Sequence, residues 1–376
     1  MNYYLIAGEA SGDLHGSNLM KALQEQDPEA SFRCWGGDRM EKAGGTLVRH
    51  YRETAFMGFL EVLTHLRSIL GFLRECKRDL LAVRPDALIL IDYPGFNLRI
   101  AEFAHQHSIP VFYYISPQVW AWKKKRVHRL GRYADRIFVI LPFEKAFYER
   151  FGYEVEFVGH PLLDAIDDER KALPDRSGLL EELGASERPI LALLPGSREQ
   201  EVERMLPVML ALKEDFPEHL FVIAATSSLE EGSYKEALDR KGVVVLKDRS
   251  YAVLEHAEAA LVTSGTATLE AALFEVPLVV CYSGGSLSFW IAKRLVNVPH
   301  ISLVNLIMEK EVVKELIQGE LDPERLRAEL EKILPGGRSR DRMLAELQEL
   351  REKLGGPGAS GYTAERILKT MQDGSC

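Results

Sequence analysis

The sequence has few cysteines, and none are paired at a metal-binding spacing. Cys34, Cys76, Cys281 and Cys376 lie far apart in a chain of 376 residues. This argues against a disulfide framework or a zinc site and is typical of a protein in the reducing cytosol. No other cluster of metal ligands is apparent, so the sequence predicts neither a metal nor a cofactor.

Long apolar runs and an excess of basic residues are also missing. No stretch approaches the roughly 20 apolar residues that span a bilayer, and the N-terminus lacks the pattern of a secretory signal. We therefore expect a chain that is neither exported nor membrane-spanning. The net charge of -9 argues against nucleic acid as a partner.

Both halves of the chain alternate short apolar runs with longer amphipathic segments. The runs in the first half include residues 3–7, 86–92 and 110–116, and those in the second half include 189–196 and 259–265. This alternation predicts an α/β protein with doubly wound parallel sheets. A charged stretch at 167–176 interrupts it. We therefore expect two domains, residues 1–165 and 166–340, followed by a helical segment at 341–376, with ligands in a cleft between the domains.

The stretch LIAGEASGDLHG at residues 5–16 runs from a strand into a glycine-containing turn. Its glycine spacing fits neither a dinucleotide-binding turn nor a P-loop, and its two acids would repel a phosphate. Gly12 permits close backbone approach, and Ser11, Asp13 and His15 are candidate contacts to an uncharged, hydroxyl-rich group. The alternative is an ordinary capped turn between strand and helix.

Asp92 follows the apolar run ALILI and precedes Pro94 and Gly95. Catalytic side chains often stand at the carboxyl ends of strands in parallel sheets. A partly desolvated carboxylate there could take a proton from a sugar hydroxyl as general base. Its alternative role is to cap the helix that begins near Phe96.

Two segments are candidates for contact with lipid. One is an amphipathic helix from residue 56, whose large apolar residues form more apolar surface than packing against a single sheet needs. The other is a basic segment with two tryptophans. The alternatives are a core helix and a solvated helix face. The candidate residues are Phe56, Met57, Phe59, Leu60, Phe72, Trp120, Trp122, Lys123, Lys124, Lys125 and Arg126.

Two turns in the second half suit a nucleotide diphosphate. Gly196, Ser197 and Arg198 lie at the start of a helix, where free N–H groups and a guanidinium favour a phosphate. Ser264, Gly265 and Thr266 open a second helix, and Glu270 lies one turn further on, where it could accept both hydroxyls of a ribose. Each turn alone could be ordinary capping, whereas two in one cleft indicate a nucleotide site.

Together these stretches resemble the lipid-A-disaccharide synthase family of inverting glycosyltransferases. The resemblance covers residues 3–320 and rests on GEASGDLHG, DYPGFN, SPQVWAWKKKRV, LPFEKAFY, VGHPLLD, LLPGSREQEV, TSGTATLEAAL, FWIAKRLV and VVKELIQ. Gly95 stands where some relatives carry a second acid, and Val304 where the family usually has proline. The resemblance implies a GT-B fold of two Rossmann-like domains, the first for the acceptor and the membrane and the second for the UDP-sugar.

The resemblance also implies the reaction and its partners. The family transfers 2,3-diacylglucosamine from UDP-2,3-diacylglucosamine to the 6-hydroxyl of 2,3-diacylglucosamine 1-phosphate, without a metal, at the cytoplasmic face of the bacterial inner membrane. By analogy Asp92 would be the base, and Glu9 and Asp13 would be further catalytic residues. Glu9, Asp13 and Ser11 would line the cleft near the acceptor and the sugar, and Asn305 would lie near the donor. A homodimer with exchanged C-terminal segments is a further expectation. Other readings are a different UDP-sugar enzyme, such as an epimerase or a soluble-sugar transferase, and a non-catalytic nucleotide sensor.

Overall fold

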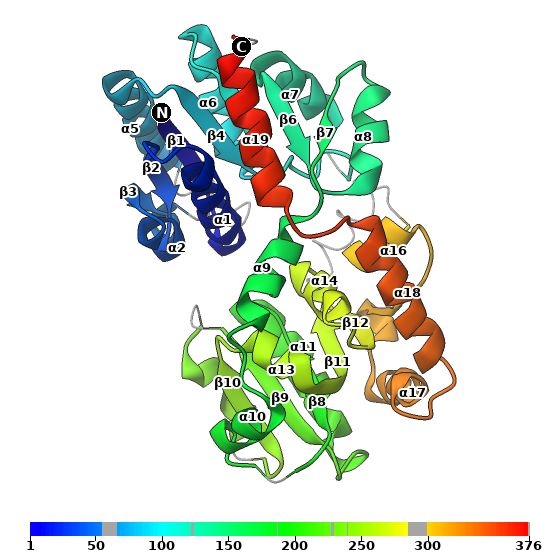
Figure 1. The fold of residues 1–376 in the computed structure, drawn as a ribbon. Coiled ribbons are helices and arrows are strands. Elements are labelled where there is room, and N and C mark those ends of the chain that lie inside the picture. Colours follow the sequence, from blue (N-terminus) through cyan, green and yellow to red (C-terminus); the bar gives the residue numbers. More distant parts are fainter. Residues whose placement is uncertain are drawn as a thin grey trace. The chain divides into compact units, whose positions relative to one another are not determined.

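The computed structural model describes residues 1–54, 66–121, 124–185, 187–226, 229–238, 240–284 and 299–374. The chain divides into two compact units, Met1–Ala165 with Leu354–Cys376, and Ile166–Lys353. Each unit contains one parallel sheet with helices around it (Figure 1). This confirms the predicted α/β class with two doubly wound parallel sheets.

The sheet of the first unit has the order β3-β2-β1-β4-β5-β6-β7. The strand order reverses direction between β1 and β4, where ligand sites form in such sheets. Strand β4 is buried at every residue, which explains its unbroken apolar sequence. The strands are β1 (Asn2–Ala7), β2 (Ser31–Gly36), β3 (Gly45–His50), β4 (Ala87–Ile91), β5 (Val111–Tyr114), β6 (Arg136–Val139) and β7 (Glu156–Phe157).

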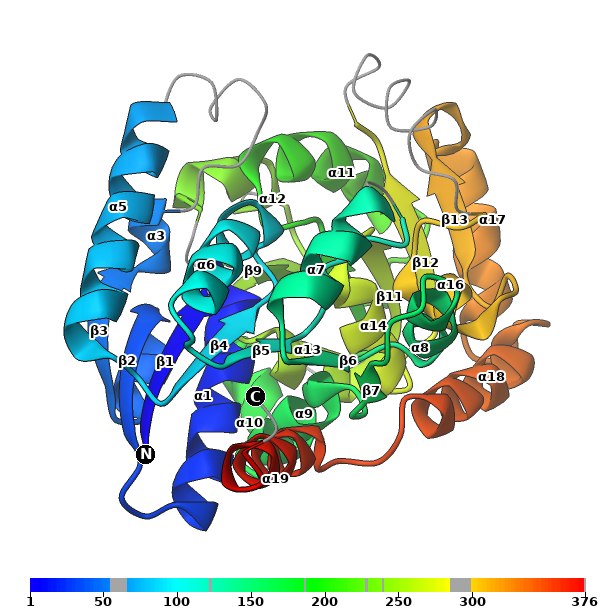
Figure 2. The same ribbon diagram turned by 90° about the horizontal axis from the view of Figure 1, so that it is seen from above.

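Alternate residues of β1 enter two separate cores, one on each face of this sheet. Leu5 packs with α1 and α19, whereas Tyr4 and Ile6 pack with α5, α6 and α7. Figure 2 shows the same division of helices between the two faces. The helices are α1 (Ala10–Gln26), α2 (Asp38–Lys42), α3 (Tyr51–Thr54), α5 (Leu66–Val83), α6 (Pro94–Gln106), α7 (Val127–Tyr133), α8 (Pro142–Glu149), α9 (Pro161–Arg170), which continues into the second unit, and α19 (Ala359–Gln372).

The second unit has a six-stranded sheet of order β10-β9-β8-β11-β12-β13. Its strands are β8 (Ile190–Leu194), β9 (Leu220–Ala225), β10 (Val243–Lys247), β11 (Ala257–Thr263), β12 (Leu278–Tyr282) and β13 (Lys314–Ile317). Its helices are α10 (Arg176–Glu182), α11 (Glu199–Ala211), α12 (Lys235–Leu238), α13 (Ser250–His256), α14 (Thr266–Leu273), α16 (Leu303–Met308), α17 (Pro323–Ile333) and α18 (Arg340–Lys353).

The chain returns to the first unit at Leu354, later than the expected start of a separate segment at residue 341. The reason is that α18 packs against α14, α16 and α17, so it belongs to the second unit. Helix α19 instead lies along α1, as both ribbon views show (Figures 1 and 2). The carboxylate of Asp164 fixes its beginning by accepting the backbone N–H groups of Gly358 at 2.5 Å and Ser360 at 2.9 Å.

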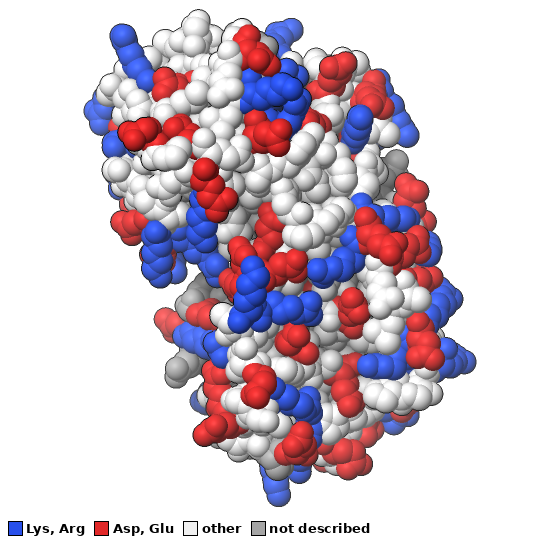
Figure 3. All heavy atoms as spheres, viewed as in Figure 1, with Lys and Arg blue, Asp and Glu red and all other residues white. Residues whose placement is uncertain are grey.

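Two surface properties bear on the expected partners. Within the described ranges, no helix is both long and apolar enough to cross a membrane. Acidic and basic side chains are interspersed over the face of the molecule in Figure 3. Neither sign of charge dominates that face.

Candidate active site

The ends of β1 and β4 lie side by side in the first sheet. Their register pairs Ala7 with Ile91, so the turns that carry Glu9 and Asp92 leave the same edge of the sheet as neighbours. The Tyr93 ring lies against Gly8, where an added Cβ would stand 2.3 Å from a ring carbon. Glycine at this position is therefore what allows the two turns to touch.

The backbone at Asp92 is held in an unusual conformation. Asp92 and Tyr93 have φ values of 41° and 46°, in the left-handed region that non-glycine residues seldom adopt. The Asp92 carbonyl accepts hydrogen bonds from the Tyr113 hydroxyl at 2.6 Å and the Asn97 amide at 2.9 Å. Strained residues held in this way concentrate at functional sites. The sequence analysis missed Asn97 and Tyr113, because both side chains donate to the backbone carbonyl of Asp92 and no sequence motif marks such a bond.

The electrostatics of this turn suit a base. Burial, followed by the negative charge of Glu9, raises the pKa of Asp92 to about 7, against opposing effects of a backbone hydrogen bond and Arg126. Ser11 donates a hydrogen bond of 2.5 Å to Glu9, which places a hydroxyl and two carboxyl groups at one sheet edge. A carboxyl that titrates near neutral pH can exchange a proton with a substrate hydroxyl.

Asp13, His15 and Gly12, which the first turn also carries, are buried in the first unit. The Asp13 carboxylate accepts the N–H groups of Gly37 at 2.7 Å, Arg39 at 3.0 Å and Met40 at 3.1 Å, so it anchors the start of α2. Its expected catalytic role stays a prediction. His15 is buried beside His160, and burial lowers the pKa of His15 to about 4. Gly12 packs against Ala7, with an added Cβ at 3.1 Å from the alanine methyl.

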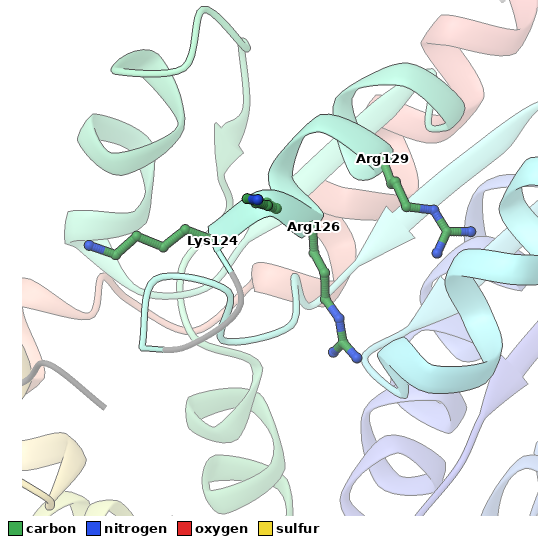
Figure 4. Close-up of a pocket in the computed structure, with 4 residues that line it drawn as sticks. Lys124, Arg126 and Arg129 are labelled. Atoms are coloured by element: carbon green, nitrogen blue, oxygen red, sulfur yellow. The ribbon is translucent and has the colours of Figure 1, made fainter. Parts of the chain in front are cut away.

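A pocket of about 500 Å³ is lined by Lys124, Lys125, Arg126 and Arg129 (Figure 4). Its residues belong to the 3₁₀ turn η1 (Lys124–Arg126) and to α7. Arg129 donates to the Glu102 carboxylate at 2.8 Å and to the Leu98 carbonyl at 3.3 Å, which ties the pocket to α6. The basic segment is thus partly ordered against the helix that begins just after Asp92.

Two residues expected to contact lipid pack inside the first unit. Trp120 is buried and meets Phe143 edge to face at 4.9 Å between ring centroids, and Phe72 meets Trp35 in the same way at 6.3 Å. The half-buried Phe72 packs against the core, as the core-helix alternative expects. The buried Trp120 fits neither lipid contact nor a solvated helix face. Phe56, Met57, Phe59, Leu60, Trp122 and Lys123 lie outside the described residues.

In the second unit, β8 and β11 also end side by side, with Leu194 paired to Val262. After β8, Glu201 organises the turn by accepting the Ser197 N–H at 3.1 Å and the Arg198 guanidinium at 2.9 Å. Gly196 has a φ of 122°, and an added Cβ there would stand 2.5 Å from Glu201. The turn therefore presents Arg198 at the start of α11 with its side chain 60% exposed.

The turn after β11 carries Ser264, Gly265 and Thr266 into α14. The Ser264 hydroxyl donates to the Ile301 carbonyl at 3.1 Å, and Gly265 and Thr266 are exposed. Glu270, one turn along α14, accepts a hydrogen bond from the Tyr251 hydroxyl at 3.2 Å. Burial raises the pKa of Glu270 to about 7, and Glu169 adds to the shift. The exposed turn and this carboxyl thus occupy one edge of the second sheet.

Asn305 is fully buried, and its amide serves the fold. Its oxygen accepts the N–H groups of Val312 and Val313, and its nitrogen donates to the Val313 carbonyl and to Glu315. Glu315 also accepts from the Ile301 N–H, the Ser302 N–H and the Ser302 hydroxyl. With these bonds made, Asn305 holds the segment next to the Ser264 turn in place, and its expected position near the donor stays a prediction.

Comparison with known proteins identifies the family of this chain. The family model described as lipid-A-disaccharide synthetase matches residues 3–359. Two relatives named lipid-A-disaccharide synthase are 42% identical in Syntrophus aciditrophicus, over 99% of this chain and 98% of the relative, and 41% identical in Geobacter metallireducens, over 98% and 96%.

Solved structures share the fold at much lower sequence identity. The UDP-GlcNAc 2-epimerase from Neisseria meningitidis bound to UDP-GlcNAc has a TM-score of 0.71 at 11% identity and covers 98% of this chain and 100% of its own. The S. aureus MnaA-UDP co-structure has a TM-score of 0.70 at 13% identity, over 99% and 96%. This likeness confirms the predicted GT-B fold. The match across the sequence goes further, and the chain belongs to the lipid-A-disaccharide synthetase family of glycosyltransferases.

Proposed function

We propose that this chain transfers 2,3-diacylglucosamine from UDP-2,3-diacylglucosamine to the 6-hydroxyl of 2,3-diacylglucosamine 1-phosphate. The products are a β-1,6-linked disaccharide 1-phosphate and UDP. The observation that carries the proposal is the family match over residues 3–359. The two carboxyl groups at the end of β1 and β4 support it, because a hydroxyl nucleophile needs a proton acceptor.

In this proposal Asp92 is the general base and Glu9 sustains its raised pKa. The 6-hydroxyl of the acceptor gives its proton to the Asp92 carboxylate while its oxygen attacks the anomeric carbon of the donor. The bond from that carbon to the diphosphate breaks on the opposite face, and the bonding electrons leave with UDP. The configuration at the anomeric carbon is therefore inverted.

We assign UDP to the second unit. The exposed Arg198 and the N-termini of α11 and α14 offer positive charge and N–H groups to the diphosphate. Glu270 could accept the ribose hydroxyls. Ser197, Ser264, Gly265 and Thr266 line the two turns, and the relation of β8 to β11 places those turns together.

We further propose that the protein works as a peripheral protein on the cytoplasmic face of the inner membrane. Both substrates carry acyl chains, and Lys124 and Lys125 are exposed cations suited to anionic headgroups. Helix α19, which packs on α1, is the segment that a homodimer could exchange between its two copies.

Mass analysis of the products tests the function. The protein is incubated with both acylated substrates in detergent, and separately with UDP-N-acetylglucosamine alone. We expect one new mass for the acylated disaccharide 1-phosphate, with release of UDP, in the first incubation. Epimerised or hydrolysed UDP-N-acetylglucosamine, with no disaccharide from the acylated pair, would support an epimerase-like enzyme instead.

The pH profile provides an independent check on Asp92. An acid with a raised pKa is protonated below that pKa and cannot act as a base, so activity should be lost as the pH falls. We expect kcat/KM to drop about tenfold per pH unit below pH 7 and to level off above it. Glu9→Gln should move the midpoint to lower pH, since it removes a neighbouring negative charge. A midpoint that stays in place in Glu9→Gln would contradict this assignment.

A further inference from the structure

The pocket on η1 and α7 concentrates charge of one sign. All four lining residues, Lys124, Lys125, Arg126 and Arg129, are cations in a chain of net charge -9. On the face shown in Figure 3, by contrast, acidic and basic side chains alternate. The site is open and shallow and is lined mainly by the aliphatic stems of these side chains, so the four charged ends surround it and attract an anion.

The two arginines of the pocket differ from the two lysines. Lys124 and Lys125 are exposed, whereas Arg126 and Arg129 are partly buried. Figure 4 shows Arg126 and Arg129 extending to one side of the pocket and Lys124 to the other. Arg129 is fixed by its bonds to Glu102 and Leu98. Both arginines are thus less exposed than the lysines, and Arg129 is held in place. A guanidinium can make two parallel hydrogen bonds to a phosphate, which suits a defined anionic ligand.

Arg126 of this pocket lies close to the proposed base. The charge of Arg126 reaches Asp92 and opposes the rise of its pKa. A third guanidinium, that of Arg99, hydrogen-bonds the Gly95 carbonyl in the first turn of α6. Burial, together with the charges of Arg129 and Arg99, lowers the pKa of Arg126, while Tyr113 and Asp92 oppose that shift. An anion held between the guanidinium groups of Arg126, Arg129 and Arg99 would relieve the repulsion between their positive charges.

We propose that Arg126, with Arg129 beside it, binds the 1-phosphate of the acceptor and so directs the acceptor's 6-hydroxyl to Asp92. The inference rests on the proposed function, which supplies an acceptor with a phosphate. In a pyranose, C1 and C5 flank the same ring oxygen. C6, with its hydroxyl, is attached to C5, so the 1-phosphate and the 6-hydroxyl lie on the same side of the sugar as the ring oxygen. A cation near the base can therefore hold the phosphate while the base meets the 6-hydroxyl.

The test compares two acceptors, with and without the 1-phosphate, in nonionic detergent. We expect Arg126→Gln to lower kcat/KM for the phosphorylated acceptor about 10- to 100-fold, the effect of losing a charge-assisted phosphate contact. For the acceptor without phosphate the change should stay within about threefold, and Arg126→Lys should recover part of the loss. Arg132→Gln, at an exposed position of α7, is the matched control and should leave both acceptors unaffected.

The other outcomes overturn the proposal. Equal losses for both acceptors would mean that Arg126 acts on Asp92 or on the fold. A loss seen only on phosphatidylglycerol vesicles, and not on phosphatidylcholine vesicles or in nonionic detergent, would mean that Arg126 contacts the membrane surface. If the unaltered chain transfers sugar to neither acceptor, the proposed function fails and this inference fails with it; an active chain with an indifferent Arg126→Gln variant overturns the inference alone.

Discussion

Asp92→Asn is expected to reduce the rate of sugar transfer by about 10²- to 10⁴-fold, the usual contribution of a general base, while UDP binds as before. Asparagine has nearly the shape of aspartate but cannot accept the proton of the 6-hydroxyl. The bonds from Tyr113 and Asn97 end on the backbone carbonyl, so the turn should keep its conformation. Single-turnover rates with both acylated substrates and calorimetric titration with UDP measure the two quantities.

A matched control lies at the other end of the same strand. Asp86, just before β4, accepts the Asn2 N–H at 2.7 Å at an exposed position. Asp86→Asn makes the same chemical change far from the sheet edge that carries Glu9, so transfer should stay near the unaltered rate. If Asp92→Asn behaves like this control, Asp92 is not the general base. A simultaneous loss of UDP affinity would point to a disturbed fold.

Glu315→Ala is expected to reduce the free energy of unfolding of the second unit by about 3–5 kcal/mol. The substitution removes the acceptor for the half-buried Ile301 N–H, for both donors of the buried Ser302 and for the buried Asn305 amide, all around the start of α16. Buried donors without partners carry the full cost of lost hydration. Urea denaturation gives the free energy, and hydrogen exchange over residues 299–317 reports the local opening.

Glu311→Ala is the control for this change. Glu311 is exposed four residues earlier and pairs with Lys314 at 3.2 Å. Exposed ion pairs of this kind contribute little, so its loss should change the free energy of unfolding by less than about 1 kcal/mol. Similar values for the two variants would show that the Glu315 network does not hold the loop.

Structural features that depend on consecutive residues could be predicted from the sequence. The run ALILI is buried on both faces and reads as a central parallel strand, and Asp92 follows it at the edge where such sheets bind ligands. The turn at Gly196 and Arg198 could also be predicted, because a strand, a glycine and the start of a helix follow one another there in the sequence.

Features that depend on distant segments were not open to prediction. Asp13 looked like a polar contact to substrate, but its partners are backbone groups of α2, more than twenty residues further along the chain. Trp120 looked like part of a lipid-facing segment, and only the position of Phe143 makes it a core residue. Asn305 matched a family motif, but its four bonds depend on β13 and the loop before it.

The return of α19 to the first unit has a consequence for the order in which the protein can fold during synthesis. The core beneath β1 joins Leu19 and Leu23 of α1 to Ile367 and Leu368 of α19, nearly the whole chain length apart. The second unit, Ile166–Lys353, is continuous in sequence. A ribosome-bound chain can therefore complete the second unit before α19 has been synthesised. Until α19 packs on α1, the apolar residues of α1 that it will cover stay exposed to water, and such exposed apolar surface favours aggregation of the nascent chain.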